Sequence, residues 1–152
     1  KELEDKGHKF FSVSDTEVIL KSYQEYGEGC LNKFNGIFAF AIWNGQKKEL
    51  FLARDHIGVK PLYYFQDGSK FIFSSEIKGI LAHNISREID LEGLRHYFSL
   101  SYVPQPLTIF KNIKKLPPAC WLKLKNGKIE ISVVSDVRND TIPAYALPNN
   151  AL

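Results

Sequence analysis

The stretch Ala53-Arg54-Asp55-His56-Ile57-Gly58-Val59-Lys60-Pro61-Leu62-Tyr63-Tyr64 decides how this chain folds. Two charged residues, Arg54 and Asp55, close an apolar strand-like segment, Gly58 permits a turn, and Pro61 opens the next apolar segment. A buried Arg–Asp corner is costly unless its hydrogen bonds are satisfied. The sequence therefore predicts a polar corner that ties two β-elements together.

Hairpin signals lie on both sides of this corner. Residues 37–43 are apolar at every position, which predicts a strand buried on both faces, and Asn44-Gly45 turns the chain into a return strand over 50–54. Two further hairpins are expected, over 62–65 with 70–74 and over 121–124 with 128–131. These patterns predict an α+β fold of antiparallel hairpins covered by a few helices.

Two helices carry clear start signals. Ser14 and Glu17 have capping-box spacing ahead of an apolar stripe, which predicts a helix that ends at Gly27. Asp90 is the predicted N-cap of the second helix, whose inward residues are expected to be Leu91, Leu94, Tyr97 and Phe98. Shorter elements are expected as a helix end over 1–9, a strand over 10–13 and a helix over 76–81.

The composition is that of a globular domain. The chain has 152 residues, of which 44% are hydrophobic, and a net charge of +3, which is too weak to favour a nucleic-acid partner. No apolar run approaches the length of a membrane span, and no signal-peptide pattern is present. Periodicity fades after Ser132, so we expect a domain over 1–132 and a linker or tail over 133–152.

Several kinds of chemistry find no support in the sequence. Cys30 and Cys120 lie in apolar surroundings, which predicts buried thiols in a reducing, cytoplasmic compartment rather than nucleophiles. The histidines have no partner at metal-ligand spacing, so no metal site is expected. A glycine-rich phosphate loop is missing, and no cofactor is expected in this segment.

Four charged residues are candidates for function. Asp15 falls in the first turn of a helix, where the dipole alone explains a carboxylate, although such a group also suits a substrate ammonium. Arg54, Asp55 and Glu76 are either a catalytic set or a structural ion network. Charged groups fixed between strands often shift one another's pKa values without taking part in catalysis, which favours the structural role.

Four stretches of the sequence resemble a known family. They are residues 14–20, residues 31–41, residues 54–64 with 75–78, and residues 102–106 with 116–118. The first three resemble the glutaminase domain of class II amidotransferases, and the fourth is more similar to the glutamine-hydrolysing asparagine synthetases. The resemblance implies an N-terminal-nucleophile fold, in which two stacked antiparallel sheets are flanked by helices, incomplete here at its N-terminus.

The resemblance also implies a reaction. In the family an N-terminal cysteine attacks the side-chain amide of glutamine, and the ammonia released serves ATP-dependent amidation of aspartate in a C-terminal synthetase domain, where ATP and Mg²⁺ bind. Only one substrate contact carries over, because Asp15 matches the acidic residue that holds the glutamine α-ammonium. The nucleophile is expected upstream of Lys1, so the chain alone is expected to be inactive and poorly stable.

The implied partners are glutamine, the synthetase domain and a second copy in a homodimer. Two alternatives stay open at the level of sequence. One is the glutaminase domain of another class II amidotransferase, and the other is a non-catalytic binding module on the same scaffold.

Overall fold

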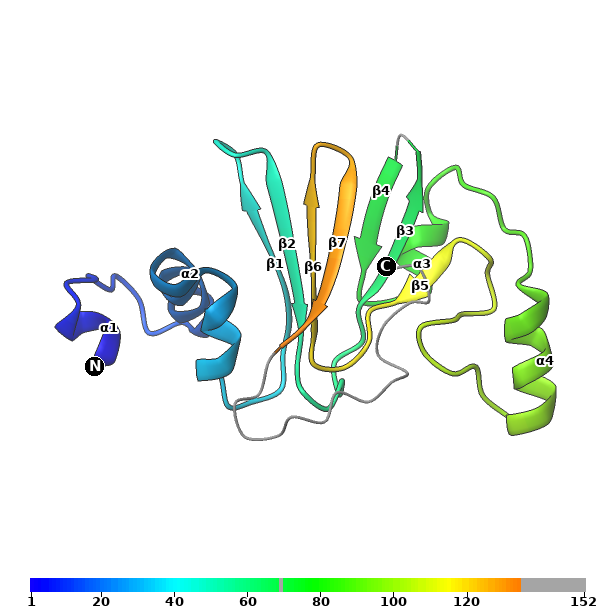
Figure 1. Cartoon of the computed structure of the whole chain (residues 1–152), viewed down its shortest axis with the longest axis horizontal. Coiled ribbons are helices and arrows are strands. Elements are labelled where there is room, and N and C mark those ends of the chain that lie inside the picture. The colour runs from blue at the N-terminus through cyan, green and yellow to red at the C-terminus, as the bar shows by residue number, and fades with distance from the viewer. Residues whose placement is uncertain (69, 135–152) are drawn as a thin grey trace.

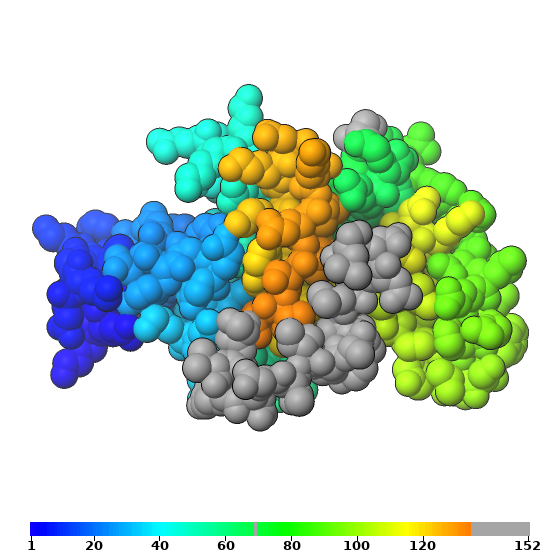
Figure 2. All heavy atoms as spheres, in the orientation of Figure 1, coloured from blue at the N-terminus to red at the C-terminus, as the bar shows by residue number. Residues whose placement is uncertain are grey.

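The computed structural model describes residues 1–68 and 70–134. Two antiparallel sheets lie face to face in the middle of the molecule, with helices on their outer faces (Figure 1). The layers therefore run helix, sheet, sheet, helix. The N-terminal helices and α4 lie at opposite ends of this arrangement, as the space-filling view shows (Figure 2).

The larger sheet has the strand order β1-β2-β6-β7. Its strands are β1 (Ala39–Asn44), β2 (Glu49–Arg54), β6 (Cys120–Lys125) and β7 (Lys128–Val133). The smaller sheet has the order β4-β3-β5 and contains β3 (Tyr63–Asp67), β4 (Lys70–Ser74) and β5 (Ile113–Lys115). All pairings are antiparallel, and the three hairpins expected from the sequence are confirmed.

Strand β2 is the centre of the core, because it is buried along its whole length. Leu50 and Leu52 pack between the two sheets, while Phe51 and Ala53 pack under the N-terminal helices, as the two-residue period of a strand requires. Two-sided burial was expected instead for residues 37–43, and that prediction is wrong. Residues 39–43 lie within β1, an edge strand of the described sheet, and Ile37 and Trp43 are 58% and 61% exposed.

Helix α2 (Asp15–Tyr26) and the 3-10 helix η1 (Gly27–Lys33) cover the outer face of the larger sheet. The hydroxyl of Ser14 accepts from the Thr16 N–H, which confirms the N-cap. Glu17 does not complete a capping box, because its carboxylate accepts from the N–H groups of Phe11 and Ser12. Those bonds hold residues 10–13 as a loop around the helix end, so the strand expected there is absent from the structure.

Helix α4 (Leu91–Leu100) begins at Asp90, whose carboxylate accepts from the N–H groups of Glu92 and Gly93. Of the predicted inward stripe of α4, only Leu94 is half-buried; Leu91 is 77% exposed, Phe98 is 78% exposed and Tyr97 is also exposed. The helix approaches the domain through Gly93 instead. A Cβ atom at Gly93 would lie 2.5 Å from the carbonyl oxygen of Thr108, so only glycine allows this close contact.

The remaining helices are α1 (Glu2–Asp5) and α3 (Ile77–Leu81), and α3 packs on the outer face of the smaller sheet. Near the expected boundary at residue 132, Val133 ends β7 and Val134 is buried. The rest of the predicted linker or tail, 135–152, lies outside the described residues. No helix in the described ranges is both long and apolar enough to cross a membrane.

Candidate functional site

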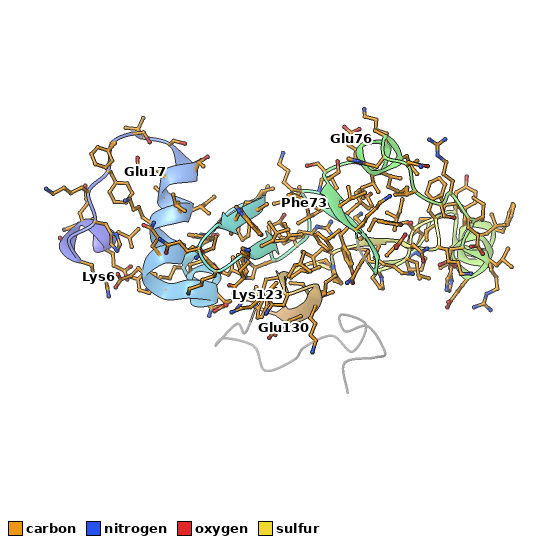
Figure 3. All side chains as sticks on the ribbon, turned by 90° about the horizontal axis from the view of Figure 1, so that it is seen from above. Lys6, Glu17, Phe73, Glu76, Lys123 and Glu130 are labelled. Atoms are coloured by element: carbon orange, nitrogen blue, oxygen red, sulfur yellow. The ribbon has the colours of Figure 1, made fainter. Side chains whose placement is uncertain are left out.

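A groove of about 540 Å³ lies where α2 begins, β1 begins and β4 ends. Asp15 lines it from α2, Phe40 from β1 and Phe38 from just before β1, and Ser75 and Glu76 line it after β4. Figure 3 shows Glu17 of α2, Phe73 of β4 and Glu76 along the same long side of the molecule, opposite Lys123 and Glu130. The groove therefore joins segments from both sheets on one side.

Asp15 is exposed in this groove and is not the cap of its own helix. The cap is Ser14, and no hydrogen bond or ion pair within the described residues occupies the Asp15 carboxylate. The helix dipole still favours a negative charge at this position. A carboxylate held at a helix end, without a protein partner in the described ranges, is available to a cationic group that enters the groove.

Glu76 lies in the same groove and not in the corner with Arg54 and Asp55. Its carboxylate pairs with the ammonium of Lys78 at 2.6 Å, and its side chain is 58% exposed. An ion network of all three residues is therefore not assembled in the part of the chain that the structure describes. The groove also contains Lys60, an exposed cation that the sequence reasoning did not single out, although it belongs to the stretch that decides the fold.

Arg54 is only 2% exposed, and its guanidinium is satisfied almost entirely by main-chain oxygens. Its Nε donates to the Lys60 carbonyl at 2.6 Å, its Nη1 donates to the Leu116 carbonyl at 2.5 Å, and its Nη2 donates to the Gly58 carbonyl. Nη1 also donates to the side-chain oxygen of Gln105 at 2.6 Å. Burial lowers the pKa of this arginine, and the neighbouring Asp55 charge acts in the opposite direction.

The Asp55 carboxylate accepts hydrogen bonds from the backbone of the turn that follows it. One carboxylate oxygen accepts from the N–H groups of Ile57 and Val59 at 3.2 and 3.0 Å, and the other accepts from Lys60 at 3.1 Å. Burial raises the pKa of this carboxyl, but the converging backbone N–H groups outweigh burial and hold the pKa below its usual range. The corner thus consists of two charged residues that each bind backbone, without an ion pair between them among the described residues.

Gly58 completes the corner by close approach. Its φ is +71°, and an added Cβ atom would lie 2.9 Å from the Arg54 guanidinium carbon and 2.9 Å from Pro118. The glycine is therefore needed both for its left-handed backbone and for the space in front of Arg54. Arg54, Asp55 and Gly58 hold Lys60 and Pro61 in place at the wall of the Asp15 groove.

Neither cysteine can serve this groove. Cys30 and Cys120 are both free and fully buried, and burial raises their pKa values to about 12 and about 11, respectively. A nucleophilic thiol needs the opposite shift. Within the described ranges, no group of three or more His, Cys, Asp or Glu side chains could hold a metal ion.

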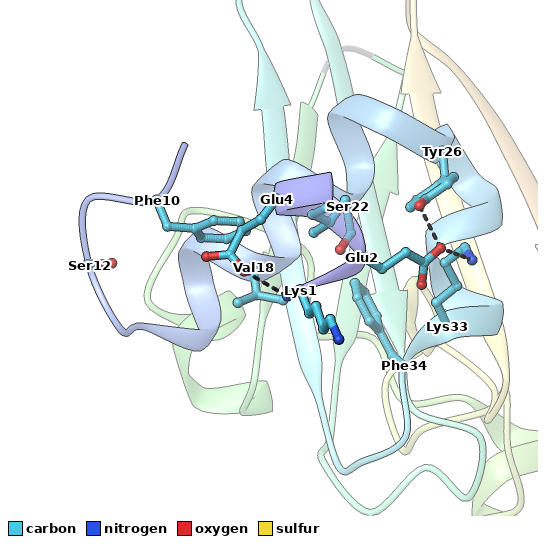
Figure 4. Close-up of a pocket in the computed structure, with 11 residues that line it drawn as sticks. Lys1, Glu2, Glu4, Phe10, Ser12, Val18, Ser22, Tyr26, Lys33 and Phe34 are labelled. Atoms are coloured by element: carbon cyan, nitrogen blue, oxygen red, sulfur yellow. Dashed lines mark hydrogen bonds and ion pairs between the residues drawn. The ribbon is translucent and has the colours of Figure 1, made fainter. Parts of the chain in front are cut away.

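A second cavity, of about 400 Å³, lies between α1 and α2 (Figure 4). Glu2 in this cavity is already paired, because its carboxylate accepts from Tyr26 and from Lys33, each at 2.8 Å. These bonds fasten α1 to α2 and η1. The Asp15 groove is the better candidate for a ligand site, because no residue in the described part of the chain pairs with the Asp15 carboxylate.

Comparison with known proteins identifies the class. A family model described as a glutamine amidotransferase domain matches residues 1–134, and the chain belongs to this family. The chain is 51% identical over 133 residues to glutamine-hydrolyzing asparagine synthetase 3 of Bacillus subtilis. This match covers 86% of this chain and 22% of the relative. It is 48% identical over 106 residues to a putative glutamine-hydrolyzing asparagine synthetase 2 of Methanocaldococcus jannaschii, covering 68% of this chain and 21% of the relative.

The chain therefore spans about a fifth of the length of these relatives. Among solved structures, it is similar to glutamine phosphoribosylpyrophosphate amidotransferase from B. subtilis, with a TM-score of 0.59 and 18% identity over 88% of this chain and 25% of the other. At this identity the likeness concerns the fold. The predicted α+β sandwich of the N-terminal-nucleophile type is confirmed.

Proposed function

We propose that this chain is part of the glutamine-hydrolysing domain of an asparagine synthetase, and that the complete domain releases ammonia from glutamine for the amidation of aspartate. The family match and the two asparagine synthetase relatives support the proposal. The observation that carries it in the structure is Asp15, a carboxylate at the mouth of a groove with no partner within the described residues. In this role Asp15 binds the α-ammonium of glutamine.

The groove offers matching surfaces for the rest of an amino-acid substrate. Phe38 and Phe40 give an apolar wall against which a short aliphatic side chain packs, and Lys60 adds a positive charge. A charge-assisted contact to an ammonium is directional as well as strong, so Asp15 fixes the orientation of the substrate. The buried corner of Arg54 and Asp55 acts indirectly, because it positions Lys60.

The attacking thiolate comes, in this proposal, from a segment upstream of Lys1. Strands β1 and β4 both lie at sheet edges in the described structure, and the groove is lined by Phe40 of β1 and by Ser75, which directly follows β4. An edge strand presents unpaired N–H and C=O groups that accept a further strand. A segment paired there would bring its N-terminal cysteine to the groove, where the thiolate attacks the glutamine amide and ammonia leaves.

The whole protein extends this proposal. ATP and Mg²⁺ bind an accompanying synthetase domain outside the given sequence, and that domain uses the ammonia. A cytoplasmic location agrees with two free, buried cysteines. A homodimer stays a prediction, which light scattering on the full-length protein tests.

The decisive experiment is Asp15→Asn in the full-length protein, with glutamine hydrolysis measured by glutamate release. Loss of a charge-assisted bond of about 1.5–3 kcal/mol predicts a rise in KM for glutamine of about 10- to 150-fold. The matched control is Asp67→Asn, which neutralises an exposed carboxylate at the end of β3, outside the groove, and should leave KM unchanged.

An unchanged KM in Asp15→Asn overturns the proposed role of this residue. Glutamine binding without hydrolysis by the wild-type full-length protein would instead favour the non-catalytic module. The chain 1–152 alone should show no glutaminase activity. Any rate from it that Cys30→Ala or Cys120→Ala abolishes contradicts the proposal.

A further inference from the structure

We propose that the apolar face of α4, together with the groove beneath it, is the docking surface for the additional domain that accompanies this one in its relatives, and that Lys115 pairs there with a carboxylate of that domain. The inference rests on the proposed function only in assigning this chain to a longer protein. The docking surface is defined by Leu91, Phe98, Tyr97, Tyr102 and Lys115.

The first observation is the exposure of large apolar side chains on one end of the molecule. On and just after α4, Leu91 and Phe98 are each more than three-quarters exposed, and Tyr97 and Tyr102 are more than half exposed. Their helix contacts the domain through Gly93. Isolated exposed apolar residues are ordinary, but a group gathered on one helix and its following loop marks a contact surface.

The second observation is a groove of about 480 Å³ that continues this face inward. Its walls are Tyr97 and Phe98 from α4, Tyr102 and Leu107 from the following loop, and Tyr63 from β3. The groove lies at the end of the molecule that α4 occupies in Figures 1 and 2. An aliphatic or aromatic side chain from a partner fits a depression lined in this way.

The third observation is Lys115, which lies in the groove without an anionic partner among the described residues. It is half-buried, its ammonium lies 5.7 Å from the centre of the Tyr63 ring, and burial and the nearby Arg54 charge lower its pKa. Two other half-buried lysines do have such partners, since Lys114 beside it pairs with Asp90 at 3.6 Å and Lys123 on β6 pairs with Glu28. A desolvated ammonium of this kind is best satisfied by a carboxylate that arrives with an apolar surface.

The choice of occupant follows from size. The exposed face extends over the outside of α4, beyond the groove itself, which is more surface than a small carboxylate ligand covers. About four-fifths of each asparagine synthetase relative lies outside the matched part, so a large partner exists in the same polypeptide. A partner in the same chain is present at high effective concentration, so even a modest surface suffices.

Zero-length carbodiimide crosslinking of the full-length protein, followed by peptide mass spectrometry, tests this directly. We expect an amide between Lys115 and an Asp or Glu beyond residue 152, formed within one copy, so mixed light- and heavy-isotope protein gives no mixed pair. The internal pairs Lys114–Asp90 and Lys111–Glu88, at 3.6 and 2.9 Å, are positive controls. If the controls crosslink but Lys115 does not, or joins only a second copy, the proposal is overturned.

A substitution gives a second, independent readout. Phe98→Asp in the full-length protein should raise amide hydrogen exchange over residues 91–100 at least tenfold and lower the yield of the Lys115 crosslink, with glutaminase kcat/KM retained. The control Ile57→Asp places the same charge at a side chain that is 80% exposed elsewhere, and should change neither. Unchanged exchange in Phe98→Asp contradicts docking at α4, whereas failure of the Asp15 experiment leaves this result intact.

Discussion

Arg54 and Gln105 are 51 residues apart in the sequence, yet the Arg54 Nη1 donates to the Gln105 side-chain oxygen at 2.6 Å. This bond joins the end of β2 to the loop that leads from α4 to β5. Both residues belong to stretches that resemble the amidotransferase family, 54–64 and 102–106, and these stretches thus meet at the Arg54 guanidinium. The hydrogen bond between Arg54 and Gln105 gives a structural reason why the two stretches occur together in one sequence.

Replacing Arg54 should strongly destabilise the domain. Arg54→Met leaves the Lys60, Leu116 and Gly58 carbonyls without their buried donor, and we expect a loss of about 3–5 kcal/mol in the free energy of unfolding. Urea unfolding of the protein that contains this domain measures the change. The control Arg95→Met removes an exposed arginine of α4 and should cost less than about 0.5 kcal/mol. Equal effects of the two substitutions contradict the role of the corner.

The stability contributed by Asp55 should depend on pH in the acid range. Its pKa in the folded protein lies below the ordinary value of 3.8, so its contribution is complete above that value and is lost as the pH falls through the lower, folded pKa. Asp55→Asn should cost about 1–3 kcal/mol at pH 7. The difference between wild type and variant should shrink below about pH 4, and a constant difference down to pH 2 contradicts the assignment.

Gly58→Ala should destabilise the fold, whereas Gly29→Ala should not. At Gly58 the left-handed backbone alone costs about 1–2 kcal/mol with a side chain, and the new methyl group also displaces Arg54. At Gly29 an added Cβ atom meets nothing within 4 Å. Thermal unfolding of the two variants side by side tests this. If Gly58→Ala is as stable as the wild type, Arg54 can move without loss of stability, which contradicts the prediction.

The two cysteines should be unreactive in the folded protein. Burial raises the pKa of both thiols, and both side chains are fully buried, so alkylation requires opening of the core. We expect labelling by iodoacetamide at least about 10³-fold slower than in the urea-unfolded protein. Rapid labelling of either residue under native conditions contradicts this and reopens the question of a thiol nucleophile within the chain.

Hairpins and helix starts could be predicted because their signals are local. Asn126 and Gly127 both have positive φ in the last hairpin, as an Asn-Gly turn requires, and Ser14 and Asp90 cap the helices that follow them. The orientation of α4 could not be predicted, because an apolar stripe at helical spacing does not reveal whether the domain or a partner covers it. The prediction that residues 37–43 are buried on both faces failed for the same reason, because apolar residues at every position do not show which face of the strand is covered.

The candidate site was only partly visible in the sequence. Asp15 could be predicted as a candidate site residue because it lies at a helix start within a stretch that resembles the amidotransferase family, and the structure puts it in a groove. Lys60 and the aromatic wall could not be assigned, since their proximity to Asp15 depends on the packing of two sheets against each other. Glu76 was grouped with Arg54 and Asp55 by sequence character alone, and the fold separates it from them.

One guanidinium connects two distant surfaces of this protein. Arg54 binds the carbonyl of Lys60 at the wall of the Asp15 groove, and it binds Gln105 in the loop that borders the α4 groove. A displacement of that loop would therefore break the Gln105 bond or move Arg54 and, with it, the Lys60 carbonyl at the wall of the Asp15 groove. Through one buried side chain, the corner therefore connects the groove that we propose binds glutamine with the face that we propose contacts a neighbouring domain.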